Sequence, residues 1–429
     1  MFCVCENILL SDISSKLTSD SLKEFLREEF GPDAEFVQYK ILTGASKGES
    51  YLSTVYRIEV EGKSSRDEKK LVLHLIVKCL PASAARRKTF RSLEFFRNEV
   101  AFYNKVVPAF IEFQNKQKPK HPFVEFPRCY FALADGENDI VVMEDVSYKN
   151  YKTTNRQDGL NYEQCEILMN VLGRFHALSI AMKEKEPGAF KEAVPSLFET
   201  YYKPETKAWY INQLQLFTDI AIDAVTKELL EKVYEEKLRK FADNSCFDRM
   251  CEYVKPKEPY AVISHGDAWA PNFLVRRSAE NENGKVEGIC MIDYQLARYS
   301  SPVLDISFFL YSCASENVLF NQFDDILKAY YKSLIDFVTD LGLPAEILFP
   351  FKEFQKEILS YFAFGLGMSL ESVPLSILDA DQTPDVESMS GEEEIPLTEI
   401  WALKPIESKE GRMRLALNVK HAVDNKFIL

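Results

Sequence analysis

The stretch ISHGDAWAPNFLV, residues 263–275, is the part of the sequence that decides the fold. Its apolar start predicts a short buried strand, and its apolar end predicts a second strand. The loop between them carries Asp267 and, five positions later, Asn272. Two strands that flank a loop of this kind hold an acid and an amide at a fixed spacing.

A second acid follows in CMIDYQ, residues 290–295, where an apolar strand ends at Asp293. We expect the strand ends to bring oxygen atoms of Asp267, Asn272 and Asp293 to one point. Mg²⁺ prefers hard oxygen ligands of this kind and keeps several of its waters. The three residues therefore predict a magnesium site beside a catalytic loop.

A cation for the phosphate side is expected upstream. The run LVLHLIVK, residues 71–78, reads as a buried strand that ends in Lys78. A lysine inside an apolar region is costly unless it is paired. A helix predicted over residues 90–105 carries Glu99 midway along its length, and this acid is the expected partner of Lys78.

The pattern HGDxxxxN, followed by a strand that ends in an acid, resembles the catalytic and metal-binding loops of aminoglycoside and choline phosphotransferases. By that resemblance Asp267 and Asn272 are catalytic, and Asp267 accepts or orients the proton of the acceptor hydroxyl. Asn272 and Asp293 would hold Mg²⁺ against the phosphates of ATP. Lys78 and Glu99 match the strand lysine and helix glutamate that grip nucleotide phosphates in kinases.

The resemblance also implies where the rest of the nucleotide lies. The hinge that faces the adenine would be Met143, Glu144, Asp145 and Val146. The loop above the phosphates would include Gly44 and Gly48, although this loop lacks the full glycine pattern.

The closer resemblance is to the ecdysteroid kinase-like family, also called CHK kinase-like, and it extends over nearly the whole chain. The segments that carry it are GESYLSTVYR (48–57), FRNEVAFY (96–103), MEDV (143–146), LGRFHALS (172–179), HGDAW (265–269), DYQ (293–295), PVLD (302–305) and 412–423. The family implies phosphorylation of ecdysteroids or related hydroxylated lipophilic compounds, with a proposed role in detoxification.

Four further residues lie close to these motifs in the sequence. His265 is expected to support the site rather than act as a base, because Asp267 fills that role. His176, on an apolar helix face, reads as a hydrogen-bonded core histidine. Asp305 is expected to stabilise the catalytic loop by hydrogen bonds. Trp269 could belong to the core or line the acceptor pocket, and the sequence leaves both possibilities open.

The order of the predicted elements indicates an α+β, bilobal protein-kinase-like fold. A small lobe with an antiparallel sheet is expected over residues 1–145 and would carry the phosphate grip and the hinge. A large, mostly helical lobe is expected over residues 146–429 with the catalytic loop, the metal loop and the acceptor site. Within it, the acidic residues 379–396 are short on apolar side chains and predict a flexible loop.

The composition excludes several other classes of protein. The formal net charge of −14 over 429 residues is unfavourable for binding nucleic acid. The nine cysteines have no zinc-binding spacing and indicate reduced thiols. A signal peptide is not expected, because the first residues lack a basic segment and a long apolar core. A membrane span is not expected, because no apolar run approaches ~20 residues. These features predict a cytoplasmic protein.

Three other functions are alternatives to a steroid kinase. A catalytically silent nucleotide- or ligand-binding protein would not need to keep Asp267, Asn272 and Asp293 together. A protein kinase is disfavoured because SPVLD, residues 301–305, follows the metal loop and leaves no room for an activation segment. A choline- or sugar-type acceptor stays open, as do the acceptor hydroxyl, ATP against GTP, and the oligomeric state.

Overall fold

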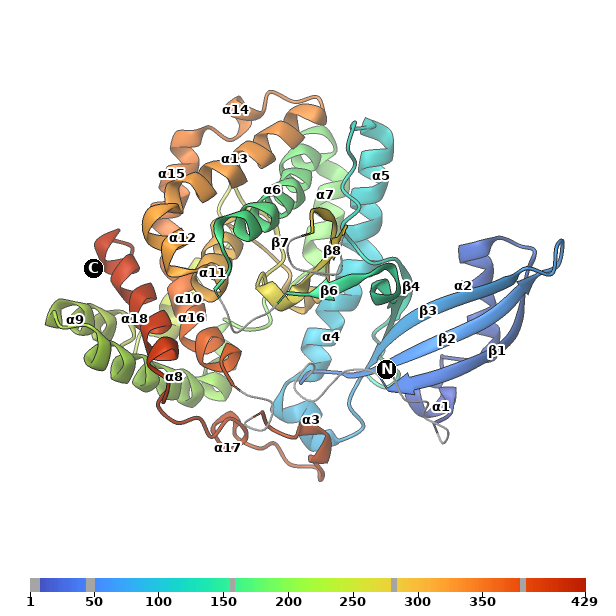
Figure 1. Ribbon diagram of the computed structural model, residues 1–429, viewed down its shortest axis with the longest axis horizontal. Helices are drawn as coiled ribbons and strands as arrows, with labels where there is room; N and C mark the ends of the chain where they lie inside the picture. Colours follow the sequence, from blue (N-terminus) through green and yellow to red (C-terminus); the bar gives the residue numbers. More distant parts are fainter. Residues whose placement is uncertain (1–7, 44–50, 155–158, 279–283, 379–382) are drawn as a thin grey trace.

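An antiparallel sheet occupies the N-terminal part of the chain (Figure 1). The computed structural model describes residues 8–43, 51–154, 159–278, 284–378 and 383–429. The five strands lie in the order β1-β2-β3-β5-β4. Their bounds are β1 (Ala34–Thr43), β2 (Thr54–Ser64), β3 (Lys70–Cys79), β4 (Cys129–Leu133) and β5 (Ile140–Glu144).

One face of this sheet is apolar because alternate residues of its strands point to the same side. Ile58 and Val60 on β2 and Leu75 on β3 are buried there. Helix α2 (Ser19–Phe30) lies on this face and contributes Leu22 and Leu26 to the same cluster. The short helix α1 (Leu10–Ile13) precedes it.

The helix predicted over residues 90–105 is longer and less regular than expected. After α3 (Ala84–Thr89), helix α4 (Ser92–Ala101) continues through a π-helical turn, Phe102–Val106, into α5 (Val107–Gln117). Glu99 lies in the last turns of α4, beside the end of β3. Helix α4 lies between the sheet and the mostly helical remainder of the chain (Figure 1).

The remainder of the chain is mostly helical, as predicted, so the α+β, kinase-like architecture is confirmed. Its helices are α6 (Tyr162–Lys185), α7 (Pro187–Ala193), α8 (Lys207–Glu228), α9 (Lys232–Phe241), α10 (Cys246–Tyr253), α11 (Val303–Cys313), α12 (Glu316–Asn321), α13 (Phe323–Asp340), α14 (Ala345–Leu348), α15 (Phe351–Tyr361), α16 (Ala363–Ser376), α17 (Leu397–Ile400) and α18 (Lys409–Asp424).

Short strands interrupt these helices at the expected place. They form a pair, β7 (Val262–Ser264) with β10 (Arg298–Ser300), and a three-stranded sheet, β6 (Tyr151–Thr153), β8 (Phe273–Arg277) and β9 (Val286–Met291). The loops between these strands carry the predicted catalytic and metal residues. These strands lie between the N-terminal sheet and the helices (Figure 1).

The acidic segment expected to be a flexible loop has little regular structure, but its described part is anchored. Residues 379–382 lie outside the described residues. Beyond them, the Ala85 N–H donates to Gly391 O at 3.0 Å, and Arg86 pairs with Glu387 at 2.7 Å. The segment thus packs on α3, where Glu387 forms an ion pair with Arg86.

Among the described residues, no single helix has both the length and the apolarity needed to cross a membrane. The helices α15 and α16 meet that test only when taken together, and they are bent by 50° at their junction.

Candidate active site

The end of β3, helix α4 and the loop after β9 meet at one charged cluster. The Nζ of Lys78 lies 2.9 Å from Glu99 Oε1 and also pairs with Asp293 Oδ1. Lys78 is 8% exposed and Glu99 is 2% exposed. Burial opposes the charged form of Lys78, but the carboxylates of Asp293 and Glu99 outweigh it and raise the pKa of Lys78. The ammonium group therefore stays protonated at neutral pH.

Asn98, next to Glu99 on α4, ties this helix to the loop that carries Asp293. Its Nδ2 donates to Gln295 O at 3.0 Å and to Ala297 O at 2.8 Å. Asn98 is fully buried. The sequence alone does not reveal this role of Asn98, because its partners lie about 200 positions away and no local pattern marks them.

The catalytic loop turns at Gly266, which has φ +80°. A Cβ atom at this position would lie 1.8 Å from the carbonyl oxygen of Leu296, so only glycine fits. The buried carboxylate of Asp305 accepts the backbone N–H of His265 at 2.6 Å and that of Gly266 at 2.9 Å. Asp305 therefore stabilises the turn through these two backbone hydrogen bonds.

Both ring nitrogens are engaged in His265, which was expected to support the site, and in His176, which was expected to be a hydrogen-bonded core histidine. His265 Nε2 lies 2.9 Å from Ile292 O, and its Nδ1 accepts the Asp267 N–H at 3.2 Å. Burial lowers the pKa of His265, and the ring is neutral. His176 Nε2 lies 3.0 Å from Asp305 Oδ2, and its Nδ1 lies 2.7 Å from Tyr330 OH. Both rings thus orient other groups.

Asp267 and Asn272 face each other across the loop. The Nδ2 of Asn272 donates to the Asp267 backbone oxygen and to Asp267 Oδ2, both at 2.9 Å. This leaves the amide oxygen as the remaining polar atom of the Asn272 side chain. Burial and the charge of Asp293 raise the pKa of Asp267 to about 7, against the opposing hydrogen bond from Asn272.

The donor set fits a magnesium ion that is shared with a nucleotide. Asp293 offers a carboxylate, and Asn272 offers an amide oxygen. Within the described ranges, no group of three or more His, Cys, Asp or Glu residues could hold a metal by itself. Mg²⁺ is commonly bound by one or two carboxylates together with substrate phosphates, so a complete protein cage is not required.

The predicted hinge leaves β5 at Glu144. The Asp145 N–H donates to His74 O at 2.9 Å, and Asp145 Oδ1 accepts the Ser147 N–H at 3.0 Å. Arg57 pairs with the same carboxylate. Met143 and Val146 are buried. Packing and hydrogen bonds thus define the course of the chain between the sheet and the helices.

Three more residues were predicted from the sequence to belong to the site, namely Gly44, Gly48 and Trp269. Gly44 and Gly48 lie outside the described residues. Trp269 is half-buried and packs against the large helical core. Its side chain could therefore serve either of the two roles expected from the sequence.

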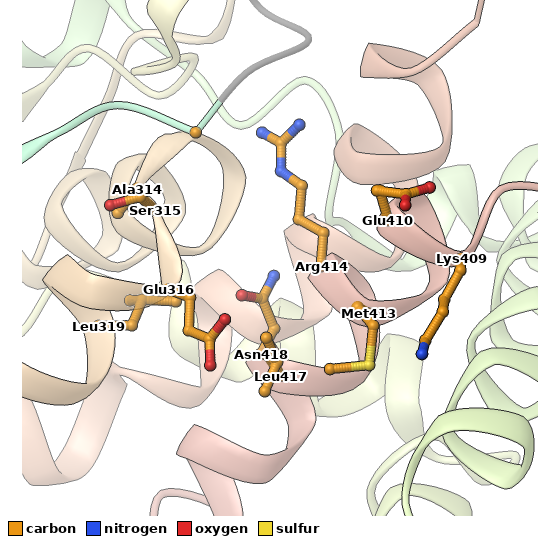
Figure 2. A pocket seen from close by; sticks show the side chains of 11 residues that line it. Ala314, Ser315, Glu316, Leu319, Lys409, Glu410, Met413, Arg414, Leu417 and Asn418 are labelled. Carbon is orange, nitrogen blue, oxygen red and sulfur yellow. The ribbon is translucent and has the colours of Figure 1, made fainter.

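A cavity of about 460 Å³ lies elsewhere, where α18 packs beside the start of α12 (Figure 2). Its lining includes Glu316, Lys409, Arg414 and Asn418. None of the predicted site residues contributes to it. This cavity is therefore separate from the candidate active site.

The paired lysine and glutamate, the hinge, and the loop with its acid and amide define a kinase-like phosphotransferase that acts on a hydroxyl of a small molecule. The model of the ecdysteroid kinase-like family matches residues 47–343, and the chain belongs to this family. The match confirms the resemblance noted in the motifs, although segment 412–423 lies beyond it. Among curated proteins, no sequence match was found.

Several solved structures show a distant similarity to this chain. An ethanolamine kinase from Plasmodium vivax is 11% identical, with a TM-score of 0.39, over 94% of this chain and 87% of the other. A choline kinase from Cryptosporidium parvum Iowa II is 12% identical, with a TM-score of 0.34, over 92% and 91%. The spectinomycin phosphotransferase APH(9)-Ia is 13% identical, with a TM-score of 0.34, over 85% and 100%.

Proposed function

We propose that this protein transfers the terminal phosphoryl group of ATP to a hydroxyl of an ecdysteroid or a similar lipophilic alcohol. The observation that carries the proposal is the contact of Lys78 with both Glu99 and Asp293, next to the loop that presents Asp267. Phosphoryl transfer needs positioning and neutralisation of charge more than covalent help. The buried ammonium, the carboxylates and the amide supply both.

Each residue then has a defined task. Lys78, held by Glu99, binds the nucleotide phosphates. Asp293 and Asn272 would hold Mg²⁺, which when bound neutralises phosphate charge. Asp267 orients the acceptor hydroxyl and takes its proton on the carboxylate. A pKa of about 7 suits that task, since a general base works best near the ambient pH.

The two parts of the chain would share the substrates between them. We propose that residues 1–145 grip ATP through Lys78, through the loop with Gly44 and Gly48, and through the backbone of the hinge, Met143 to Val146. Residues 146–429 would carry the catalytic loop and the acceptor site, with Trp269 among the candidates for its wall. His265 and Asp305 would keep the loop in shape.

A lipophilic acceptor is proposed because of the family to which the chain belongs. Phosphorylation of such an alcohol would serve either inactivation of a hormone or detoxification, because an added phosphate makes a lipophilic compound anionic and soluble.

The test is Mg²⁺-dependent consumption of ATP by the purified protein with a panel of hydroxylated acceptors that includes ecdysteroids. Products are identified by mass. A gain of one phosphate on a steroid alcohol supports the proposal. Transfer to choline or to a sugar alone would replace the proposed acceptor. Tight binding of Mg·ATP with no transfer to any compound would favour a silent binding protein.

A further inference from the structure

Helix α16 carries one charged side chain, Glu371, in the sequence AFGLGMSLESVPLS. The helix packs closely on α11, since a Cβ atom on Gly365 would lie 2.2 Å from the Ser307 backbone. Helix α11 carries Asp305, which holds the catalytic loop. In the described part of the chain, no basic side chain pairs with Glu371, although a carboxylate in apolar surroundings is costly without partners.

Two tyrosines bind this carboxylate on the same oxygen. Tyr201 OH donates to Glu371 Oε2 at 2.7 Å, and Tyr210 OH donates to it at 2.5 Å. Their rings pack edge to face at 4.8 Å. Glu371 and Tyr201 are half-buried, whereas Tyr210 is fully buried. Glu371 Oε1 has no hydrogen-bond partner among the described residues, so the carboxylate is oriented while one oxygen stays unused.

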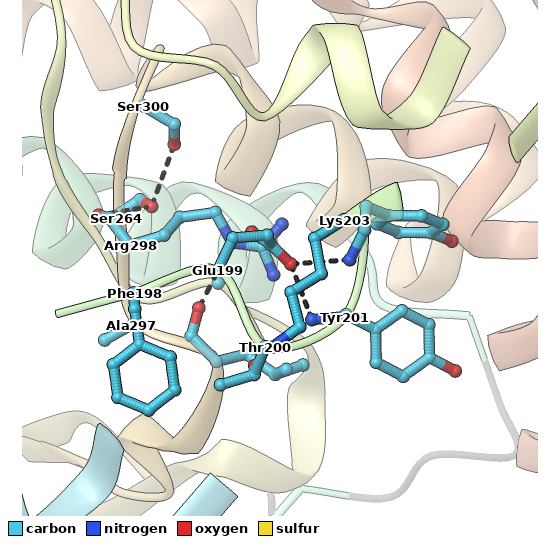
Figure 3. A network of polar contacts seen from close by, with 12 residues as sticks. Phe198, Glu199, Thr200, Tyr201, Lys203, Ser264, Ala297, Arg298 and Ser300 are labelled. Atoms are coloured by element: carbon cyan, nitrogen blue, oxygen red, sulfur yellow. Dashed lines mark hydrogen bonds and ion pairs between the residues drawn. The ribbon is translucent and has the colours of Figure 1, made fainter. Parts of the chain in front are cut away.

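Contacts of Arg298 and Glu199 link Tyr201 to the strand that leads into the catalytic loop (Figure 3). Arg298 on β10 lies opposite Ser264 on β7 in the antiparallel strand pair. Ser264 is three positions before Asp267. Its Nε lies 3.2 Å from Glu199 Oε2. Glu199 Oε1 in turn accepts the backbone N–H groups of Tyr201 and of the next residue, both at 2.7 Å. The position of Tyr201 is therefore tied to the strand that leads into the catalytic loop.

The same guanidinium also reaches helix α16, where it lies 5.8 Å from the ring centre of Phe364. On the electrostatic side, burial and the charge of Asp293 are the main causes that raise the pKa of Asp267, and the charge of Glu371 adds to them. The charge of Glu371 thus contributes to the electrostatic environment of the catalytic loop. A hydrogen-bond donor placed between two acids offsets their mutual repulsion.

We infer that Glu371 is a specificity-determining residue whose Oε1 accepts a hydrogen bond from a second hydroxyl of the acceptor, other than the one that is phosphorylated. The inference rests on the proposed function, because it assigns a contact to the acceptor of that reaction. Tyr201 and Tyr210 are positioning residues that hold the carboxylate. The acceptor is accordingly a compound with at least two hydroxyl groups.

The expected effect follows from the cost of leaving a carboxylate without its partner. A hydrogen bond to a charged group discriminates by about 10- to 100-fold. The wild-type kcat/KM for an ecdysteroid should therefore exceed that for an analogue with a single hydroxyl by about this factor. The variant Glu371→Gln should lose most of this preference, measured as the ratio of the two kcat/KM values.

Glu357→Gln is the matched control. Glu357 is also half-buried, accepts a hydroxyl hydrogen bond from Ser301 at 2.6 Å, and has a pKa raised by burial. The Glu357→Gln variant should keep the wild-type preference for the ecdysteroid over the single-hydroxyl analogue. If Glu371→Gln retains the wild-type ratio of kcat/KM for the ecdysteroid to kcat/KM for the single-hydroxyl analogue, the inference is overturned while the proposed function stands.

The failure of the proposed function has a different signature, namely no transfer by the wild type to either steroid. Calorimetric binding of the same two probes to the protein then decides the inference. Tighter wild-type binding of the polyhydroxylated probe, lost in Glu371→Gln, supports the site. Equal binding of both probes to wild type and variant overturns it.

Discussion

Replacing Gly266 by alanine tests how the catalytic loop is built. Gly266 and Gly136 both have positive φ, +80° and +89°. For a non-glycine residue this conformation costs about 1–2 kcal/mol at either position. A Cβ atom on Gly136 would meet nothing within 4 Å, whereas on Gly266 it would lie 1.8 Å from Leu296 O. The obstacle is a backbone atom, so relief requires movement of the main chain and adds about 2–3 kcal/mol.

Urea unfolding of the two variants and the wild type measures this difference. We expect Gly266→Ala to lose about 3–5 kcal/mol of unfolding free energy and Gly136→Ala to lose about 1–2 kcal/mol. Gly136→Ala should also keep its phosphoryl-transfer activity, because it lies in a turn of the sheet away from Asp267. Equal losses of stability would refute the close contact between the loop and Leu296.

Three more predictions concern single side chains. Lys78→Met should lower ATP-dependent turnover by about 100-fold or more, and Lys40→Met, on a half-buried lysine of β1 that pairs with Glu59 and Glu61, should leave it unchanged. Normal turnover of Lys78→Met in steady-state kinetics would contradict the phosphate role. Asp305→Asn should cost about 2–4 kcal/mol in urea unfolding, because it leaves buried N–H groups poorly paired, and a loss below about 1 kcal/mol would contradict this. Burial lowers the pKa of His421 to about 4 from 6.5, so the unfolded chain binds the extra proton between these pH values and stability falls as pH drops. His421→Gln should remove up to about 3 kcal/mol of that fall at pH 4, and identical pH profiles of stability would contradict it.

Much of the candidate site is predictable from sequence because its residues end recognisable apolar runs. Lys78 ends one strand, Asp293 ends another, and the HGD triplet follows a third. The structure brings Lys78, Glu99 and Asp293 into contact, and it places Asp267 against Asn272. Their catalytic and metal roles stay predictions until they are tested by activity.

Other parts of the site leave no local signal. Asn98 contacts backbone carbonyls, which are the same for every residue type, so its partners cannot be read from the sequence. Arg298 and Glu199 meet across about 100 positions. Glu371 could have been noticed as a lone charge in an apolar helix, but only the fold shows that Tyr201 is its partner.

The central claim is that Asp267 directs an acceptor hydroxyl at ATP. The most direct test is transfer of labelled phosphate from ATP to an ecdysteroid by the wild type, Asp267→Asn and a control, Asp324→Asn, at an exposed position of α13. The account predicts that Asp267→Asn loses about 10²- to 10⁴-fold in turnover with unchanged ATP affinity, while the control matches the wild type. Near-normal transfer by Asp267→Asn would contradict the account.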